Sequence, residues 1–158
     1  MAMEILIKRA EASDAHSITP LVGQLLSEIM QATGVQSFNF DLGRTATRLE
    51  RFLEQGKYFV FVAWDGVKPI GFLSIYESYA LYAEGNFGTI PELYVEPNYR
   101  SQGVGERLMD DAKRLGRARH WMRLEVTTPP LPEFLRTFSF YEREGFSVAG
   151  GRKMKVLL

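Results

Sequence analysis

Apolar residues recur at three- and four-residue spacing over 18–30, which predicts an amphipathic helix. Pro20 fits best in the first turn of such a helix, so we expect the regular helix to begin near Thr19. A second apolar stripe predicts another helix over 42–55. Both helices follow a short alternating segment, 4–9, which is typical of a first strand.

Runs of β-branched and aromatic residues on either side of Asp65-Gly66 predict an antiparallel hairpin. Both arms are apolar at nearly every position, so the hairpin is expected in the middle of a sheet with both faces covered. Two later apolar runs predict further strands, and a Gly-Gly pair predicts a last hairpin. In chain order these segments are 58–64, 70–78, 89–95, 121–126, 146–149 and 153–158.

The second half of the chain carries two more predicted helices. One covers 103–115, and an aromatic stripe with helical spacing predicts a shorter one that ends at Gly145. Three prolines within 127–132 exclude regular structure between them. The resulting order, β-α-α-β-β-β-α-β-α-β-β, predicts a single α/β domain over 1–158 with a mixed sheet.

Composition removes several classes of function. Nineteen basic and nineteen acidic side chains cancel, so we expect neither nucleic acid nor an anionic membrane as a partner. With no cysteine, the chain has no disulfide, thiolate metal site or cysteine nucleophile. His16 and His120 stand in no metal-ligand spacing, and no metal is expected. Without a spanning apolar run or a signal-peptide core, the protein is expected to be soluble and cytoplasmic.

The segment from Arg100 to Gly105 lies between a predicted strand and a predicted helix. Such a junction presents unpaired backbone N–H groups and the positive end of the helix dipole, which together suit a pyrophosphate. Gly103 and Gly105 let phosphate oxygens approach the backbone, and Arg100 can add a charge. A two-glycine turn is also common as plain structure. It contains neither GKS/GKT nor GxGxxG, so it matches neither a Walker loop nor a dinucleotide fingerprint.

Residues 90–105 read Ile-Pro-Glu-Leu-Tyr-Val-Glu-Pro-Asn-Tyr-Arg-Ser-Gln-Gly-Val-Gly. This resembles the central signature of the GNAT superfamily of N-acetyltransferases, in which Arg or Gln, two residues, Gly, one residue and Gly or Ala follow a hydrophobic strand. A second family signature appears as Phe-Tyr-Glu-Arg-Glu-Gly-Phe over 140–146. The separation of the two signatures and the order of elements also resemble the family.

The resemblance implies a mostly antiparallel sheet of six to seven strands that splays after the fourth strand, flanked by about four helices. It implies acetyl-CoA as cosubstrate, with the pantetheine arm held by backbone groups of the split strand at Leu93, Tyr94 and Val95. The pyrophosphate would then bind at Arg100, Ser101, Gln102, Gly103, Val104 and Gly105. Where most relatives carry a pantetheine-binding Asn, this chain has Phe134, so Thr127 is the candidate polar replacement.

Because no cysteine is available, direct attack of an amine on the thioester is favoured over an acyl-enzyme. The resemblance points to Glu92 as general base, acting through water; the alternative is an exposed glutamate at a strand end. It points to Tyr141 as general acid toward the thiolate; the alternative is a core tyrosine of the aromatic stripe. The Val95 N–H is the candidate oxyanion donor.

The acceptor is expected to be a primary amine of a small molecule, such as a polyamine, an amino acid or an aminoglycoside. Three carboxylates and three tyrosines are candidates for attracting and enclosing it. These are Glu28, Glu77, Glu84, Tyr76, Tyr79 and Tyr82. The alternatives are a protein N-terminal or lysine acetyltransferase, a non-catalytic acyl-CoA sensor, and a nucleotide-binding domain. A homodimer is expected, with 153–158 as the candidate edge strand.

Overall fold

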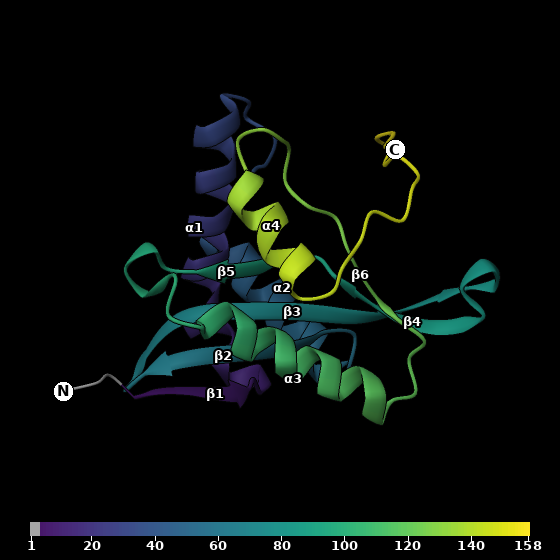
Figure 1. The fold of residues 1–158 in the computed structure, drawn as a ribbon. Helices are drawn as coiled ribbons and strands as arrows, with labels where there is room; N and C mark the ends of the chain where they lie inside the picture. Colours follow the sequence, from purple (N-terminus) through teal and green to yellow (C-terminus); the bar gives the residue numbers. More distant parts are fainter. Residues whose placement is uncertain (1–3) are drawn as a thin grey trace. The chain divides into compact units, whose positions relative to one another are not determined.

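The structure of the chain is a computed structural model that describes residues 4–158 (Figure 1). It divides into two compact units, one ending at Thr127 and one formed by Thr128–Leu158. The single domain over 1–158 stays a prediction. Within the described residues, no helix is long and apolar enough to span a membrane.

The first unit holds every strand of the described chain and three of its helices. Its elements are β1 (Ile5–Arg9), α1 (Ala15–Thr33), α2 (Leu42–Glu54), β2 (Phe59–Asp65), β3 (Lys68–Ala80), β4 (Gly85–Ile90), β5 (Leu93–Val95), α3 (Val104–Ala118) and β6 (Leu124–Val126). The second unit contains α4 (Leu135–Arg143). The prolines before α4 lie outside any helix or strand, as predicted.

The strands form one six-stranded sheet in the order β1-β2-β3-β4-β6, with β5 also paired to β3. All pairs are antiparallel except β4 with β6, which is parallel. β6 pairs with Gly88, Thr89 and Ile90 and no further, while β5 pairs with β3 alone among the described strands. The sheet therefore opens beyond Ile90, which confirms the predicted mostly antiparallel sheet with a splay after its fourth strand.

Helices cover both faces of the sheet. Figure 1 shows α3 in front of β1–β3, with α1 and α2 behind them. The core on the α1/α2 face combines side chains of both helices with even-numbered residues of the strands, because successive strand residues point to opposite faces. Its buried members are Ala15, Ile18, Leu21, Leu49, Val60, Val62, Phe72 and Tyr94.

The predicted start of the first helix is wrong. α1 begins at Ala15, and Pro20 lies inside it rather than in its first turn. The ring of Pro20 is exposed, so the His16 carbonyl that loses its N–H partner faces the solvent side of the helix. The exposed position leaves the His16 carbonyl accessible to water, which accommodates the proline.

The predicted strand over 89–95 is split into β4 and β5. Between the pairs Tyr76–Thr89 and Leu73–Leu93, β3 has two residues and the facing chain has three, which defines a β-bulge. Pro91 lies in this bulge, where its missing N–H removes a ladder hydrogen bond. The predicted strand over 121–126 is also shorter in the structure, where β6 covers only Leu124–Val126. The Trp121 N–H bonds back to the Gly116 carbonyl at the end of α3, so Trp121 does not join the strand.

The predicted C-terminal hairpin is absent. Residues 146–158 form no strand, although Gly150 and Gly151 have the positive φ of a turn. Val148, Met154, Val156 and Leu157 are each at least 79% exposed, so neither arm has an apolar face to bury. An isolated two-stranded hairpin is marginal without such burial, which explains the difference.

We predict that Gly88→Ala destabilises the fold by about 1–3 kcal/mol. A Cβ at this position would lie 2.7 Å from the Trp121 ring and 2.8 Å from Leu124, where β4 meets β6. Urea unfolding measures the change. Gly43→Ala in α2 is the matched control, since its Cβ has only an ordinary contact at 3.7 Å and it should gain up to about 1 kcal/mol. Equal stability of the two variants would contradict this packing at the β4–β6 junction.

Candidate active site

Glu92 lies in the bulge between β4 and β5, and two residues of neighbouring strands hold it there. Its backbone carbonyl accepts a hydrogen bond from the Ser74 N–H at 3.0 Å. Its carboxylate accepts from the Ser74 hydroxyl at 2.5 Å and from the Tyr58 hydroxyl at 3.2 Å. The carboxylate is therefore partly buried and oriented by two donors, rather than exposed at a strand end.

Burial sets the acid–base character of this group. Burial raises the pKa of the Glu92 carboxyl above its ordinary value, while the hydrogen bonds from Ser74 and Tyr58 act in the opposite direction. Burial and the neighbouring Glu92 charge also raise the pKa of the Tyr58 phenol, which therefore stays protonated as a donor. The result is a carboxylate that is more basic than one in water, a property that suits a general base near neutral pH.

Aromatic rings enclose one side of this carboxylate. Tyr58 stacks on Tyr76 with ring centroids 6.1 Å apart, and Phe52 of α2 lies 5.1 Å from the Tyr58 ring. Tyr58, Ser74, Tyr76 and Glu92 share the even-numbered sheet face with Phe72 and Tyr94, which is the face that α1 and α2 cover. The carboxylate thus lies on the helix α1/α2 side of the split strand. Tyr76 is the one predicted wall tyrosine that the structure brings to it.

Tyr58 and Ser74 were not identified from the sequence as site residues. A signal was present for Ser74, because it is the lone hydroxyl within the apolar run 70–75. A buried polar side chain in such a run requires a hydrogen-bond partner. Tyr58 carried no comparable signal, since an aromatic residue at the start of an apolar strand is ordinary core material.

Backbone groups of Leu93 and Val95 face away from β3. The Glu92 carbonyl and the Glu96 N–H both bond to β3, at Ser74 and Ile70, and strand backbone groups alternate in direction. The intervening N–H and C=O groups of Leu93 and Val95 therefore point into the splay. The Tyr94 side chain is buried in the core below them.

The Arg100 side chain makes its contacts with other residues of the protein. Its Nε donates to the Val95 carbonyl at 2.7 Å, and its Nη2 donates to Glu28 of α1 at 2.6 Å. The guanidinium also lies over the Tyr94 ring, 5.4 Å from its centroid. The charge that Arg100 was expected to offer to a phosphate is thus shared with Glu28.

The loop that follows has the backbone shape of an anion site. Ser101 and Gly103 have φ values of 61° and 82°, and Gly103 precedes the first residue of α3 without any side-chain cap. N–H groups of the first turn of α3 are therefore left for a ligand. A Cβ built on Gly103 meets nothing within 4 Å, so the approach is open. The side-chain amide of Gln102 donates to the Asn98 carbonyl at 3.1 Å, which connects the loop to the residues before it.

The remaining residues of this predicted site contribute in different ways. Val104 is buried, so its side chain anchors α3 and only its backbone is available. Gly105 lies in the first turn of α3. Thr127 is exposed directly after β6. This loop fits the diphosphate of a coenzyme, by its uncapped helix start and open glycine.

Tyr141 belongs to α4 in the second unit. Its ring makes edge contacts with Phe140 and Phe146, at centroid distances of 5.4 and 5.6 Å. Burial raises the pKa of the Tyr141 phenol above its ordinary value, so the group is protonated at neutral pH. Phe134, which replaces the expected Asn, is the N-cap residue of α4. The role of Tyr141 as general acid stays a prediction.

Two of the three carboxylates expected to attract the acceptor are engaged elsewhere. Glu28 pairs with Arg100, and Glu77 accepts hydrogen bonds from Trp121 at 2.5 Å and Tyr79 at 2.6 Å. These donors lower the pKa of Glu77, Tyr79 first and Trp121 second. Glu84 is exposed at the turn before β4. Its φ of 60° places it in a left-handed turn.

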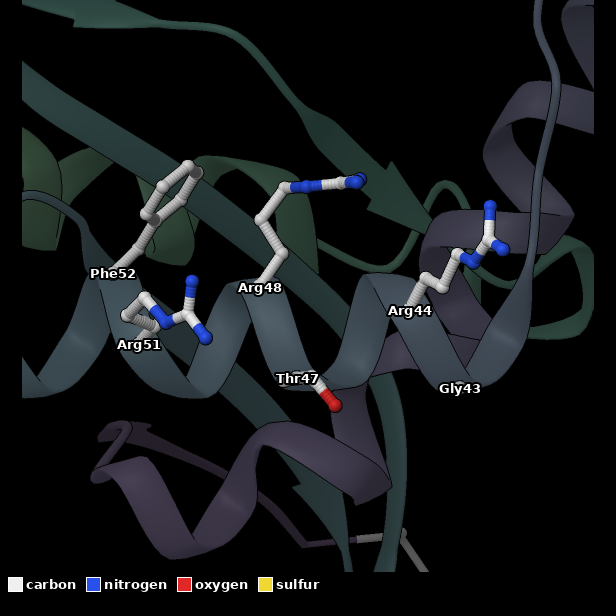
Figure 2. A pocket seen from close by; sticks show the side chains of 6 residues that line it. All are labelled: Gly43, Arg44, Thr47, Arg48, Arg51 and Phe52. Carbon is white, nitrogen blue, oxygen red and sulfur yellow. The ribbon is translucent and has the colours of Figure 1, made fainter.

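A pocket of about 490 Å³ lies on the surface of α2. Its lining consists of Gly43, Arg44, Thr47, Arg48, Arg51 and Phe52. Figure 2 shows Arg44, Arg48 and Phe52 projecting to the same side of the helix, with Arg51 beside Phe52. The pocket therefore adjoins the aromatic wall through Phe52 and carries three positive charges that the sequence analysis had not singled out.

A strand that parts at a bulge beside a partly buried carboxylate, followed by an uncapped glycine loop, suits the binding of an acyl-CoA and the removal of a proton from an amine. The family model described as the acetyltransferase (GNAT) domain matches residues 56–148, more than half of the chain. The chain therefore belongs to the GNAT family, and it is an acetyltransferase. Members of this family use acetyl-CoA.

Two curated proteins are similar in sequence. The uncharacterized N-acetyltransferase YhfO of Bacillus subtilis is 29% identical over 107 residues, which cover 68% of this chain and 67% of that protein. The thialysine N-epsilon-acetyltransferase of Caenorhabditis elegans is 26% identical over 102 residues, 65% of this chain and 63% of that protein. The matched segments thus span about two thirds of each relative.

Solved structures share the fold along the chain. The aminoglycoside N-acetyltransferase AAC(6')-Iy in complex with CoA has a TM-score of 0.81 at 16% identity, covering 99% of this chain and 97% of the other. The ribosomal-protein-alanine N-acetyltransferase of Brucella melitensis has a TM-score of 0.74 at 18% identity, covering 98% and 100%. At these identities the likeness is one of fold.

We predict that Glu92→Gln stabilises the protein at neutral and alkaline pH. The folded-state pKa of Glu92 is raised, so its favourable contribution to stability is complete below the unfolded-state pKa and is lost as pH rises through the folded one. Glutamine stays neutral, and its advantage over wild type should grow across that window. Urea unfolding from pH 4 to pH 8 measures it, with exposed Glu54→Gln as control. A Glu92→Gln difference independent of pH would contradict the raised pKa.

Proposed function

We propose that this enzyme transfers an acetyl group from acetyl-CoA to a primary amine of a small molecule, by direct attack within a ternary complex. The observation that carries the proposal is the position of Glu92. Its partly buried, hydrogen-bonded carboxylate lies in the bulge that begins the split strand, directly before the outward backbone groups of Leu93 and Val95. A base and a row of coenzyme-binding backbone groups thus follow one another in the chain.

Acetyl-CoA supplies a thioester, whose acyl carbon forms the new C–N bond as its C–S bond breaks. Glu92 accepts the proton that the acceptor's ammonium must lose, directly or through one water. Tyr58 and Ser74 orient the carboxylate through their hydroxyl groups. The outward N–H of Val95 donates a hydrogen bond where negative charge develops on oxygen.

Tyr141 is our proposed general acid. Its phenol is protonated at neutral pH and can give its proton to the leaving thiolate sulfur. The support is its place in the Phe-Tyr…Gly-Phe signature over 140–146, within the segment that the family model matches. The contacts with Phe140 and Phe146 keep the alternative of a packing tyrosine open to test.

We assign the coenzyme to three chain segments. Backbone groups of Leu93, Tyr94 and Val95 hold the pantetheine arm, with Thr127 as an additional polar contact. The loop of Arg100, Ser101, Gln102, Gly103, Val104 and Gly105 holds the pyrophosphate. For Arg100 to reach a phosphate, its hydrogen bonds to Glu28 and Val95 must be exchanged.

A small-molecule acceptor is favoured over a protein. Solved neighbours of this fold include aminoglycoside acetyltransferases, and one curated relative is named for thialysine. A neighbour named for a ribosomal-protein alanine keeps a protein acceptor as the second candidate. We further propose a homodimer, in which the exposed apolar side chains of 153–158 find their cover in a second copy.

We predict that acetyl-CoA binds with micromolar affinity and that Gly103→Trp abolishes this binding. The indole would fill the open approach to the N–H groups of the α3 N-terminus. Calorimetry measures both, with ATP and NAD as competing ligands. Gly66→Trp is the matched control, because Gly66 also has a positive φ, 61°, and open space around it. Unchanged affinity in Gly103→Trp would remove the loop from the coenzyme site, and preference for ATP or NAD would favour a nucleotide-binding domain.

We predict that Glu92→Gln and Tyr141→Phe each lower kcat by about 10²-fold or more while acetyl-CoA binding is retained. Thiol release over an amine panel measures turnover, with Glu54→Gln as the control. The acid limb of the pH–rate profile should vanish in Glu92→Gln, because the group that must lose its proton is gone. A wild-type protein that binds acetyl-CoA but acetylates no amine would instead be a sensor.

A further inference from the structure

Three arginines form a stripe along α2. Arg44, Arg48 and Arg51 follow one another at spacings of four and three residues, so they share one face of the helix. All three are exposed, and in the described part of the chain none of them makes a salt bridge. Other arginines of the protein are paired, among them Arg100 with Glu28 and Arg123 with Glu125. The guanidinium groups of the stripe are thus held in no ion pair within the described residues.

Two aromatic side chains connect the stripe with the proposed base. Phe52 lines the same pocket, its ring contacts Tyr58, and Tyr58 donates to Glu92. Arg48 stands one helical turn before Phe52, and both side chains project to the same side of α2 (Figure 2). A ligand seated in the pocket therefore lies along the aromatic wall that leads to the carboxylate.

This pocket is separate from the proposed pyrophosphate loop. α2 packs with α1 on the even-numbered face of the sheet, whereas α3, with the loop at its N-terminus, contacts the sheet from the other face. The arginines of α2 are thus left for the acceptor rather than for the coenzyme. At 490 Å³ the pocket has the size of a small-molecule site.

The charges around the base disfavour a polycation. Glu28 is paired with Arg100 and Glu77 with Arg119, so neither carboxylate balances the three guanidinium groups. A second or third ammonium group on the acceptor would be repelled there. A carboxylate would instead receive two parallel N–H···O bonds from a guanidinium fork.

We propose that the pocket on α2 binds the carboxylate of the acceptor, which makes the acceptor an amino-acid-like molecule whose distal amine reaches Glu92. Arg44, Arg48 and Arg51 supply the guanidinium groups, and Phe52 with Tyr58 covers the aliphatic part between the two ends of the acceptor. The proposal rests on the proposed function and narrows its substrate class. It selects amino acids over polyamines and aminoglycosides.

Matched pairs of amines test it, because lysine and cadaverine, or ornithine and putrescine, differ only by the carboxylate. We expect kcat/KM for the amino acid to exceed that for its decarboxylated partner by at least about tenfold, one charge-assisted contact. Arg48→Gln should reduce this ratio, and the triple Gln variant of Arg44, Arg48 and Arg51 should bring it to about one. Arg114→Gln, an exposed arginine of α3, should leave the ratio unchanged. A diamine favoured by wild type, or a ratio retained in the triple variant, would overturn the proposal. A preference for 2-aminoethyl phosphate over the amino acids would also overturn it, because the pocket would then select a phosphate rather than a carboxylate.

A binding measurement separates this proposal from the proposed function. Titration of lysine and of cadaverine into the ¹⁵N-labelled protein, with acetyl-CoA absent, follows the arginine Nε–Hε resonances directly. Shifts of the Arg44, Arg48 and Arg51 signals with lysine but not with cadaverine support the pocket even when no turnover is seen. Absence of lysine-induced shifts overturns it even when another amine is acetylated.

Discussion

The break at Pro91 and Glu92 is the constraint on which the rest of the site depends. One extra residue in the facing chain and one missing N–H interrupt the ladder along β3. The interruption turns the Glu92 carboxylate onto Ser74 and Tyr58. It also leaves the outward groups of Leu93 and Val95 without a strand partner, and Arg100 fills one of them at the Val95 carbonyl. Without the bulge the chain would continue as an ordinary strand, and the Glu92 carboxylate would not adjoin the open edge of β5.

Burial raises the pKa of the Glu92 carboxyl at a cost in stability. Desolvation disfavours the charged carboxylate in the folded protein, so the ionised group lowers the free energy of unfolding at a pH above its pKa. Ser74 and Tyr58 offset part of that cost, because their hydroxyl groups donate to the charged form. Tyr58 in turn is held by Phe52 and Tyr76, so the sheet and α2 together fix the position of one carboxylate.

Periodicity predicted the layers well, since helix and strand spacings follow from which faces are buried. It placed α2, the β2–β3 hairpin and the glycine loop before α3 correctly. It failed where single residues decide: α1 continues through Pro20, which is exposed, and Pro91 splits the fourth predicted strand. The motif predicted Glu92 as a site residue, but its hydrogen-bond partner Tyr58 lies 34 residues away in the sequence, and no local pattern joins the two. The sequence also did not mark the α2 arginines as site residues, because a charged face is usual on an exposed helix.

The hydrogen bond from Arg100 to the Val95 carbonyl has a consequence for the protein in the absence of coenzyme. An unpaired strand edge is a template on which another chain can add a strand and begin to aggregate. Here Arg100, the first residue of the glycine loop before α3, folds back over the edge that β5 exposes and bonds the Val95 carbonyl, while its charge is paired with Glu28 on α1. Arg100 thereby covers one acceptor of the open strand edge, and a pantetheine bound there as we propose would have to displace it.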